Sequence, residues 1–460
     1  MFLETVRAEG LSHLSYVIGD AGKAVVIDPR RDCRIYVDTA ARYGAQITHI
    51  FETHRHEDFV SGSLELARRT KAKILHGGAL TFKFGDNAKE GNTFDLGNVR
   101  LKILETPGHT PESLCIALID RAYSDEPVAV FTGDTLFAGG VGRTDLYPAL
   151  RDELSGQLYD SLHKKLLPLG DHVLIYPAHG EGSICGVRLA AREVSSIGYE
   201  RRTNSLLTKS RKDFIQHKIG EELYTPPYFR QMEKFNQDGI PLVAKLPEPK
   251  PADAKDFEND ALRSGLLVLD VRGPEAFAGA HIPGALSIPF DRLTLLAGWF
   301  LPYDRRIGLV MDRDDDADAA RLHLMRMGFD NVALYLAGGM RAWIRAGKPI
   351  ENLPVVSIEG LRRRVAEKEK LLVLDVRDRT EYLESPSDPS RHIWIGDLPQ
   401  KTEALPREGK IVALCTNGEC AATAASLLKQ ERFTNVEICM GAAKVYKAAR
   451  RADKAEKRAA

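Results

Sequence analysis

Short apolar runs alternate with amphipathic segments along the first half of the chain. The clearest runs are AVVID at 24–28, THIFETH at 48–54, AKIL at 72–75 and VRLKIL at 99–104. Apolar runs of four to eight residues, rich in β-branched side chains, are typical of buried strands. We therefore predict that residues 1–238 form one domain of mixed strands and helices, beginning with strands. The Pro-rich, nonperiodic segment 239–252 is predicted to be an extended linker.

The second half of the chain contains an internal repeat. The heptapeptide LLVLDVR occurs at 266–272 and again at 371–377, and MGFDNV at 327–332 resembles ERFTNV at 431–436. Buried strands that alternate with helices indicate a parallel sheet covered on both faces. We predict two α/β domains with parallel sheets, at 253–352 and 353–455. The charged tail from Ala449 onward is expected to be a frayed helix end.

Composition and charge exclude several classes of function. Hydrophobic residues make up 43% and charged residues 28% of the 460 positions, as in globular proteins with several domains. Lys+Arg and Asp+Glu both number 64, so no nucleic-acid partner is expected. We find no apolar run of the roughly 20 residues that span a bilayer and no secretory signal. The six cysteines are too sparse for a disulfide framework, so we expect a cytoplasmic protein.

Histidine and aspartate side chains follow several predicted strands of the first domain. The segments are THRHEDF at 53–59, PGHT at 107–110, FTGDT at 131–135 and YPAHG at 176–180. Alternating histidines alone are more often two surface residues than metal ligands. Loops at strand ends, however, converge on the active sites of layered α/β folds. The four segments together therefore indicate a metal site.

These segments resemble those of the metallo-β-lactamase superfamily, over about the first 235 residues. The resemblance implies an αββα sandwich. The superfamily pattern is HxHxDH, and Phe59 stands where its last histidine would be. In dinuclear members that histidine helps to hold the second metal. The departure favours a mononuclear site.

The mononuclear members that this chain resembles are persulfide dioxygenases, whose metal is ferrous iron with open positions for substrate and O₂. Carried over by motif, the metal ligands are His54, His109 and Asp134, with one Fe(II) per chain. The resemblance makes catalytic groups of His56, Asp58 and His179, which would orient ligands or move protons. A purely structural hydrogen-bonding role is the alternative for each of these three.

Two further segments of the first domain support this resemblance. GRTDL at 142–146 resembles a persulfide dioxygenase segment, so Arg143 is a candidate for binding a carboxylate of glutathione. A structural salt bridge with Asp145 is equally expected. Cys185 follows His179 closely and is a candidate sulfur relay, with a buried inert cysteine as the alternative.

A cysteine stands between a predicted strand and a predicted helix in the second repeat. Cys415 ends the apolar run KIVAL and begins a six-residue loop that leads into an Ala- and Leu-rich helix. Backbone N–H groups and a helix N-terminus would surround its sulfur, so we expect this thiol to ionise easily and to hold a persulfide. A core cysteine at a strand end is the alternative.

The order of motifs in residues 355–450 resembles the rhodaneses. The resemblance implies that Cys415 is the catalytic cysteine and that the loop binds substrate through Thr416, Asn417, Gly418, Glu419 and Cys420. The family loop often reads CxxGxRS, and Cys420 stands at the position of its arginine. That departure puts thiosulfate as the preferred donor in doubt and makes Cys420 a candidate for resolving a persulfide.

The first repeat also carries rhodanese landmarks but lacks the cysteine. An ungapped alignment from Asn331 onto Asn435 puts Met311 opposite Cys415, and the acidic loop that follows it has no thiol. We predict that this copy is catalytically silent and that it packs against or holds the active copy.

The order of parts resembles the fused persulfide dioxygenase–rhodanese proteins of bacteria. The resemblance implies that O₂ oxidises a low-molecular-weight persulfide, such as glutathione persulfide, to sulfite and thiol at a non-haem Fe(II). Sulfur transfer through a Cys415 persulfide would interconvert thiosulfate, sulfite and persulfide. Alternatives are a zinc thioester hydrolase of the glyoxalase II type and a non-enzymatic persulfide carrier or sensor. The sequence leaves the physiological thiol, the direction of sulfur transfer and a homo-oligomer open.

Overall fold

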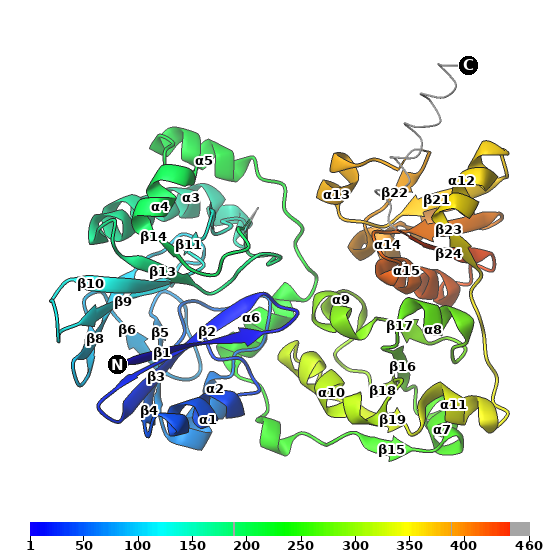
Figure 1. The fold of residues 1–460 in the computed structure, drawn as a ribbon, viewed down its shortest axis with the longest axis horizontal. Helices are drawn as coiled ribbons and strands as arrows, with labels where there is room; N and C mark the ends of the chain where they lie inside the picture. Colours follow the sequence, from blue (N-terminus) through cyan, green and yellow to red (C-terminus); the bar gives the residue numbers. More distant parts are fainter. Residues whose placement is uncertain (187–188, 388, 442–460) are drawn as a thin grey trace. The chain divides into compact units, whose positions relative to one another are not determined.

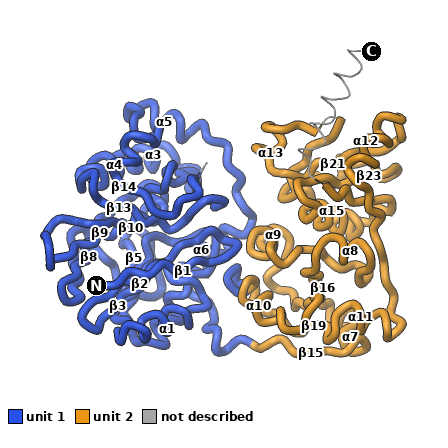
Figure 2. The backbone as a smooth tube through the Cα atoms, in the orientation of Figure 1, with its two compact units in different colours: residues 1–246, 325–328 blue, residues 247–324, 329–460 orange. Residues whose placement is uncertain are grey.

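The structure, a computed structural model, describes residues 1–186, 189–387 and 389–441. The chain forms two compact units, one of residues 1–246 with 325–328 and one of the remaining residues from Pro247 onward (Figure 2). The charged tail and the last residues of the predicted domain 353–455 lie outside the described residues. Among the described residues, no helix is both long and apolar enough to cross a bilayer.

The first unit contains two six-stranded sheets (Figure 1). The first sheet has the order β1 (Phe2–Ala8), β2 (His13–Asp20), β3 (Lys23–Ile27), β4 (Gln46–Phe51), β5 (Lys73–Gly77) and β6 (Asp86–Ala88). The second has the order β14 (Ser195–Ser196), β13 (Leu174–Pro177), β10 (Pro127–Gly133), β9 (Leu114–Asp120), β8 (Val99–Glu105) and β7 (Thr93–Leu96). The short strands β11 (Leu136–Phe137) and β12 (Gly140–Val141) pair separately. The strands predicted from the apolar runs are confirmed.

Three apolar clusters define the layers of this unit. The central cluster joins the two sheets, with side chains such as Ile27 from β3 and Phe131 from β10. A second cluster lies between the first sheet and helices α1 (Arg34–Arg42) and α2 (Ser63–Thr70). A third lies between the second sheet and helices α3 (Arg151–Ser161) and α5 (Arg211–Ile219). Helices α4 (Ile197–Thr203) and α6 (Phe229–Asp238) complete the unit. The αββα sandwich is therefore confirmed.

The loops after β4, β8, β10 and β13 carry the predicted metal-site residues, because His54, His109, Asp134 and His179 each follow the end of one of these strands. A glycine allows two of the loops to approach each other. Gly133 has a φ of +50°, and a Cβ on it would lie 2.6 Å from Thr53 Oγ1. Any side chain at this position would push the His54 loop away from Asp134.

The second unit contains two five-stranded sheets whose strand pairs are parallel, as predicted. The first has the order β15 (Lys250–Ala252), β19 (Val332–Leu336), β18 (Ile307–Val310), β16 (Leu267–Asp270) and β17 (Leu286–Ser287). The second has the order β20 (Val355–Ser357), β24 (Val436–Met440), β23 (Lys410–Leu414), β21 (Leu371–Asp375) and β22 (Arg391–His392). The identical orders confirm the repeat, and they place Met311 directly after β18 as Cys415 is placed directly after β23.

Helices α7 to α15 accompany these sheets: α7 (Ala254–Arg263), α8 (Pro274–Gly279), α9 (Leu293–Phe300), α10 (Ala317–Arg326), α11 (Gly339–Arg345), α12 (Ile358–Ala366), α13 (Arg379–Glu384), α14 (Leu398–Lys401) and α15 (Glu419–Gln430). The linker predicted over 239–252 is shorter than expected. Its last three residues form the edge strand β15, which pairs with β19. An edge strand tolerates Pro251, whose missing N–H would interrupt a central strand.

Candidate metal centre and cysteine loop

The structure brings His54, His109 and Asp134 together. Asp134 Oδ2 lies 3.6 Å from His54 Nε2 and 3.5 Å from His109 Nε2. The two imidazole rings meet edge to face, with their centroids 4.9 Å apart. All three side chains are buried. The three atoms Nε2, Nε2 and Oδ2 therefore surround one small volume.

The other polar atom of each of these side chains is held by a hydrogen bond. Thr53 Oγ1 donates to Asp28 Oδ2 at 2.7 Å, so the His54 Nδ1–H must donate to Thr53 Oγ1 at 2.9 Å. The His109 Nδ1–H donates to the carbonyl oxygen of Arg143 at 2.9 Å. Both imidazoles therefore present an unprotonated Nε2, the form in which histidine binds metals.

The converging atoms themselves lack hydrogen-bond partners. Within the described part of the chain, His54 Nε2, His109 Nε2 and Asp134 Oδ2 are buried and unpaired. Leaving such atoms unpaired is costly, and a metal ion at about 2.0–2.2 Å from each would satisfy all three. The donor set therefore fits a resident metal ion.

The predicted accessory residues lie beside this centre. His179 contacts Asp134 Oδ1 through Nδ1 at 2.7 Å and Asp58 Oδ2 through Nε2 at 2.9 Å. Burial lowers the pKa of His179, but the two carboxylates outweigh it and raise that pKa well above its ordinary value. His56 Nε2 lies 3.3 Å from Asp28 Oδ1. One donor atom each of His56, Asp58 and His179 lies within 4.8 Å of the others.

Phe59 lies next to these accessory residues. Its ring is fully buried, with its centroid 4.5 Å from that of His56 and 4.1 Å from that of His13. The position that carries a histidine in the HxHxDH pattern is therefore filled with an apolar side chain. Both ring nitrogens of His13 are buried without a hydrogen-bond partner among the described residues.

The cysteine loop has the predicted geometry around its sulfur. The N–H of Gly418 donates to Cys415 Sγ at 3.1 Å, and the N–H of Glu419 donates to Asn417 Oδ1 at 3.3 Å. Gly418 has a φ of +91°, a conformation that favours glycine, and it stands immediately before α15.

The expectation that the Cys415 thiol ionises easily is wrong in direction. Burial raises the pKa of this thiol above its ordinary value, although the backbone N–H groups of Asn417, Ala421, Gly418 and Cys420 oppose that effect. Burial also raises the pKa of Cys420, to about 12, with a further contribution from Cys415. Thr416 Oγ1 donates to Glu381 Oε1 at 2.9 Å, so this loop residue is held by a carboxylate.

Comparisons with known proteins identify both halves of the chain. Residues 8–179 match the family model of the metallo-beta-lactamase superfamily, and residues 253–346 and 357–449 match that of the rhodanese-like domain. The mouse (Mus musculus) persulfide dioxygenase ETHE1 is 30% identical over 224 residues, which make up 46% of this chain and 77% of that protein. The chain belongs to the metallo-β-lactamase superfamily. It fuses a domain related to the persulfide dioxygenases to tandem rhodanese-like domains.

Two other proteins are also similar to this chain. A hydroxyacylglutathione hydrolase of Nitrosococcus oceani is 34% identical over 178 residues, or 37% of this chain and 64% of that enzyme, so the chain spans less than two thirds of it. A solved structure of a metallo-beta-lactamase from Staphylococcus aureus is 34% identical, with a TM-score of 0.65, and it covers 73% of this chain and 98% of its own. The mouse protein is named a persulfide dioxygenase and the Nitrosococcus protein a hydrolase, so these two relatives have different activities.

The structure separates the two interpretations of Arg143. Its guanidinium makes a bidentate salt bridge with Asp145, at 2.7 and 2.8 Å, and donates to the carbonyl oxygens of Ile184 and Tyr224 at 3.2 and 3.1 Å. The side chain is also buried. Four of its five N–H groups are thus engaged, which favours the structural salt bridge over binding of a substrate carboxylate.

Cys185 lies close to the proposed metal centre, beside Asp134 and His179. A donor atom each of Asp134, His179 and Cys185 lies within 4.8 Å of the others. The thiol is buried, and burial raises its pKa well above the ordinary value. The predicted sulfur relay is therefore near the centre but is held as a neutral thiol.

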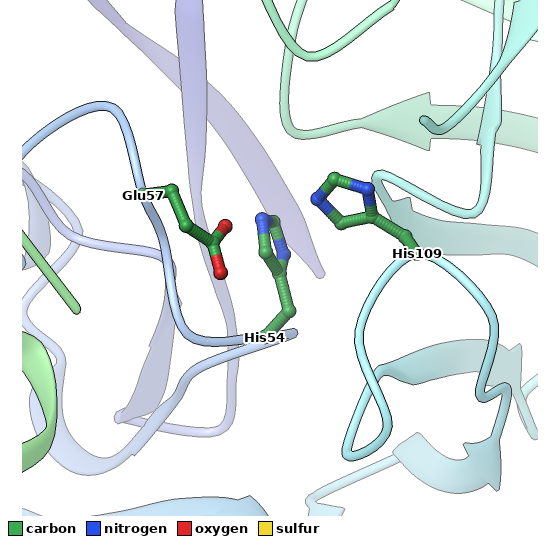
Figure 3. Close-up of side chains that lie close together, drawn as sticks. All are labelled: His54, Glu57 and His109. Carbon is green, nitrogen blue, oxygen red and sulfur yellow. The ribbon is translucent and has the colours of Figure 1, made fainter. Parts of the chain in front are cut away.

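Sequence reasoning missed Glu57. One of its carboxylate oxygens lies within 4.8 Å of ring nitrogens of His54 and His109, and Figure 3 shows the three side chains facing one another. Its Oε1 contacts Arg55 at 3.2 Å, whereas its buried Oε2 has no hydrogen-bond partner in the described residues. Burial raises the pKa of Glu57 to about 8. Glu57 occupies a variable position of the HxHxDH pattern, so the motif does not predict a role for it.

Proposed function

We propose that the first domain oxidises a low-molecular-weight persulfide, such as glutathione persulfide, with O₂ to give sulfite and the free thiol. This proposal rests on His54 Nε2, His109 Nε2 and Asp134 Oδ2, which lie close together and lack hydrogen-bond partners among the described residues. Phe59 lies beside this centre, at the position of a second-metal ligand. This donor set suits a single non-haem Fe(II), which when bound would supply open positions for substrate and O₂, so that O₂ could accept the four electrons that the outer sulfur of the persulfide loses. The similarity to a mammalian persulfide dioxygenase supports the same activity.

The chain's own residues prepare this site in three ways. His54 and His109 are fixed as neutral ligands by Thr53 Oγ1 and the Arg143 carbonyl oxygen. His179 holds Asp134 Oδ1, so that Oδ2 points toward the two histidines. Burial excludes bulk water, which strengthens each charged interaction in the centre.

The second rhodanese-like domain is proposed to transfer sulfur through Cys415. The Cys415 thiolate attacks the outer sulfur of thiosulfate, the S–S bond of thiosulfate breaks, and sulfite leaves with the bonding electron pair. The Cys415 persulfide that results is held by the loop N–H groups, and the reverse reaction turns sulfite into thiosulfate. Both domains then handle sulfite and persulfides, so their fusion raises the effective concentration of these intermediates.

A zinc-dependent thioester hydrolase is the competing function, because the hydroxyacylglutathione hydrolase of Nitrosococcus oceani is 34% identical to this domain. That reaction would use the same three ligands but with zinc. Phe59 argues against a dinuclear hydrolase, since it removes one ligand of the second metal.

Metal loading and a substrate panel would decide between the two functions. The metal-free full chain is loaded anaerobically with either Fe(II) or Zn(II) and is assayed with glutathione persulfide and with S-lactoylglutathione. We expect the iron form alone to consume O₂, only with the persulfide, and neither form to cleave the thioester. Thioester cleavage by the zinc form without O₂ consumption by the iron form would overturn the proposal. His172→Ala, an exposed histidine outside the centre, is the matched control for His54→Ala.

A further inference from the structure

Helix α15, which begins at the cysteine loop, is contacted along one face by the copy that lacks the cysteine. Glu419, Ser426 and Gln430 are spaced by seven and by four residues, so they share a helix face. Arg292 Nε donates to Glu419 Oε2 at 2.6 Å. The Ser287 N–H donates to Ser426 Oγ at 3.1 Å, and Gln430 Nε2 donates to the Gly284 carbonyl oxygen at 3.0 Å. The first copy therefore contacts α15 at its start, middle and end.

The contact at the start of α15 bears directly on the cysteine. Glu419 is the first residue of the helix, immediately after Gly418, whose N–H binds Cys415 Sγ. Glu381 is a second carboxylate at the loop, where it accepts a hydrogen bond from the Thr416 hydroxyl. Two carboxylates near an anionic sulfur substrate would repel it unless cations compensate for them.

The active copy has an arginine near this loop, but its guanidinium is already paired with a carboxylate. Arg377 is buried and makes a bidentate salt bridge with Asp375 at the end of β21. Cys420 stands within the loop itself, where it supplies no positive charge. The compensating cation at Glu419 therefore comes from the other copy.

Arg292 meets the requirements for that cation. Its side chain is 38% exposed, so one side of the guanidinium faces solvent while Nε is held by Glu419. Its charge also acts on the loop thiols. Burial lowers the pKa of Arg292, but Glu419, Cys420 and Cys415 outweigh that effect and raise it.

We propose that Arg292, supplied by the copy without a cysteine, is a specificity-determining residue of the Cys415 site that admits anionic sulfur donors of the thiosulfate class. It neutralises Glu419 and leaves a guanidinium edge for the oxyanion of the donor. This inference rests on the proposed sulfur transfer by Cys415. It assigns the cysteine-less copy a direct part in the site rather than a role in packing alone.

A pair of thiol reagents tests the charge at the loop without relying on turnover. Iodoacetate is an anion and iodoacetamide is neutral, and both alkylate Cys415, which peptide mass spectrometry distinguishes from the other five cysteines. We expect Arg292→Ala to lower the ratio of the iodoacetate rate to the iodoacetamide rate by about three- to tenfold, from the loss of one nearby charge. Arg292→Glu lowers this ratio further, Arg292→Lys largely preserves it, and Glu419→Gln raises it.

Steady-state sulfur transfer from thiosulfate to cyanide gives the second readout. Arg292→Ala is expected to raise KM for thiosulfate by a similar factor with little change in kcat. The double variant Arg292→Glu/Glu419→Arg exchanges the two charges and so keeps one cation and the ion pair. It is expected to bring KM for thiosulfate most of the way back to the wild-type value. Arg313→Ala, an exposed arginine of the same copy paired with Asp315, is the control and leaves both readouts unchanged.

The outcomes separate this inference from the proposed function. If thiosulfate is turned over but neither the alkylation ratio nor KM responds to Arg292→Ala and Arg292→Glu, the assignment of Arg292 is wrong. If the wild-type chain shows no sulfur transfer while the alkylation ratio follows the charge at position 292, the sulfur-transfer function fails and the anion-admitting role stands. Unchanged thermal unfolding midpoints exclude loss of fold as the cause of either result.

Discussion

The Nδ1–H of His179 donates a 2.7 Å hydrogen bond to Asp134 Oδ1, which leaves Asp134 Oδ2 facing His54 and His109. The opposite ring nitrogen of His179 lies 2.9 Å from Asp58 Oδ2. We infer that His179, whose two ring nitrogens both face carboxylates, orients Asp134 and does not bind the metal itself.

His179→Ala is expected to lower the affinity for Fe(II) or Co(II) by about 10- to 100-fold, because Asp134 loses the group that orients it. Competition with a chromophoric chelator measures the affinity. An affinity equal to that of the wild-type chain would show that His179 does not position Asp134, and His172→Ala controls for general effects of removing a histidine.

Phe59→His is expected to raise the metal content from one ion to two per chain. The new imidazole would lie beside His56, whose ring centroid is 4.5 Å from that of Phe59, and near Asp58 and His179. Elemental analysis after metal loading and desalting measures the stoichiometry. A content that stays at one ion would mean that Phe59 is not what prevents binding of a second metal.

Glu57→Gln is expected to weaken metal binding several-fold at pH 9, where the Glu57 carboxyl is ionised, because it then removes a negative charge within 4.8 Å of His54 and His109. The d–d spectrum of the Co(II)-substituted chain reports any accompanying change in the centre. Glu112→Gln is the matched control, since Glu112 is a buried carboxylate that binds the Arg55 N–H. Equal losses in the two variants would contradict a particular role for Glu57.

Alkylation of Cys415 by iodoacetamide is expected to accelerate with pH and to show no plateau up to about pH 9. The thiolate is the reactive form, and burial raises the pKa of Cys415 above its ordinary value, so the reactive fraction keeps growing over this range. A plateau near neutral pH would show that the loop N–H groups outweigh burial. Cys415→Ala should abolish sulfur transfer and leave persulfide oxidation intact.

The sequence predicted the elements whose periodicity is local. The apolar runs at β3, β4 and β8 and the repeated LLVLDVR segment all form strands, because their apolar side chains pack into the core. Edge strand β15 was missed because its proline-rich composition is that of a linker.

The chemistry of the sites was predictable only where a motif carried it. The histidine and aspartate segments lie together at the loops that follow β4, β8, β10 and β13. Glu57 was not predicted because it occupies a variable position of the motif. Arg292 was not predicted because it is separated from Glu419, its partner, by 127 residues of sequence. The ionisation of Cys415 was misjudged because the degree of burial of one sulfur atom is a property of packing, which a loop sequence does not specify.

Oxygen consumption by the chain loaded with one Fe(II), measured together with sulfite release on addition of glutathione persulfide, tests the central claim most directly. We predict that sulfite appears in equal amount to the O₂ consumed, and that Asp134→Ala abolishes both. Sulfite formation without O₂ consumption, or full O₂ consumption by Asp134→Ala, would contradict the assignment of His54, His109 and Asp134 as the centre that oxidises persulfides.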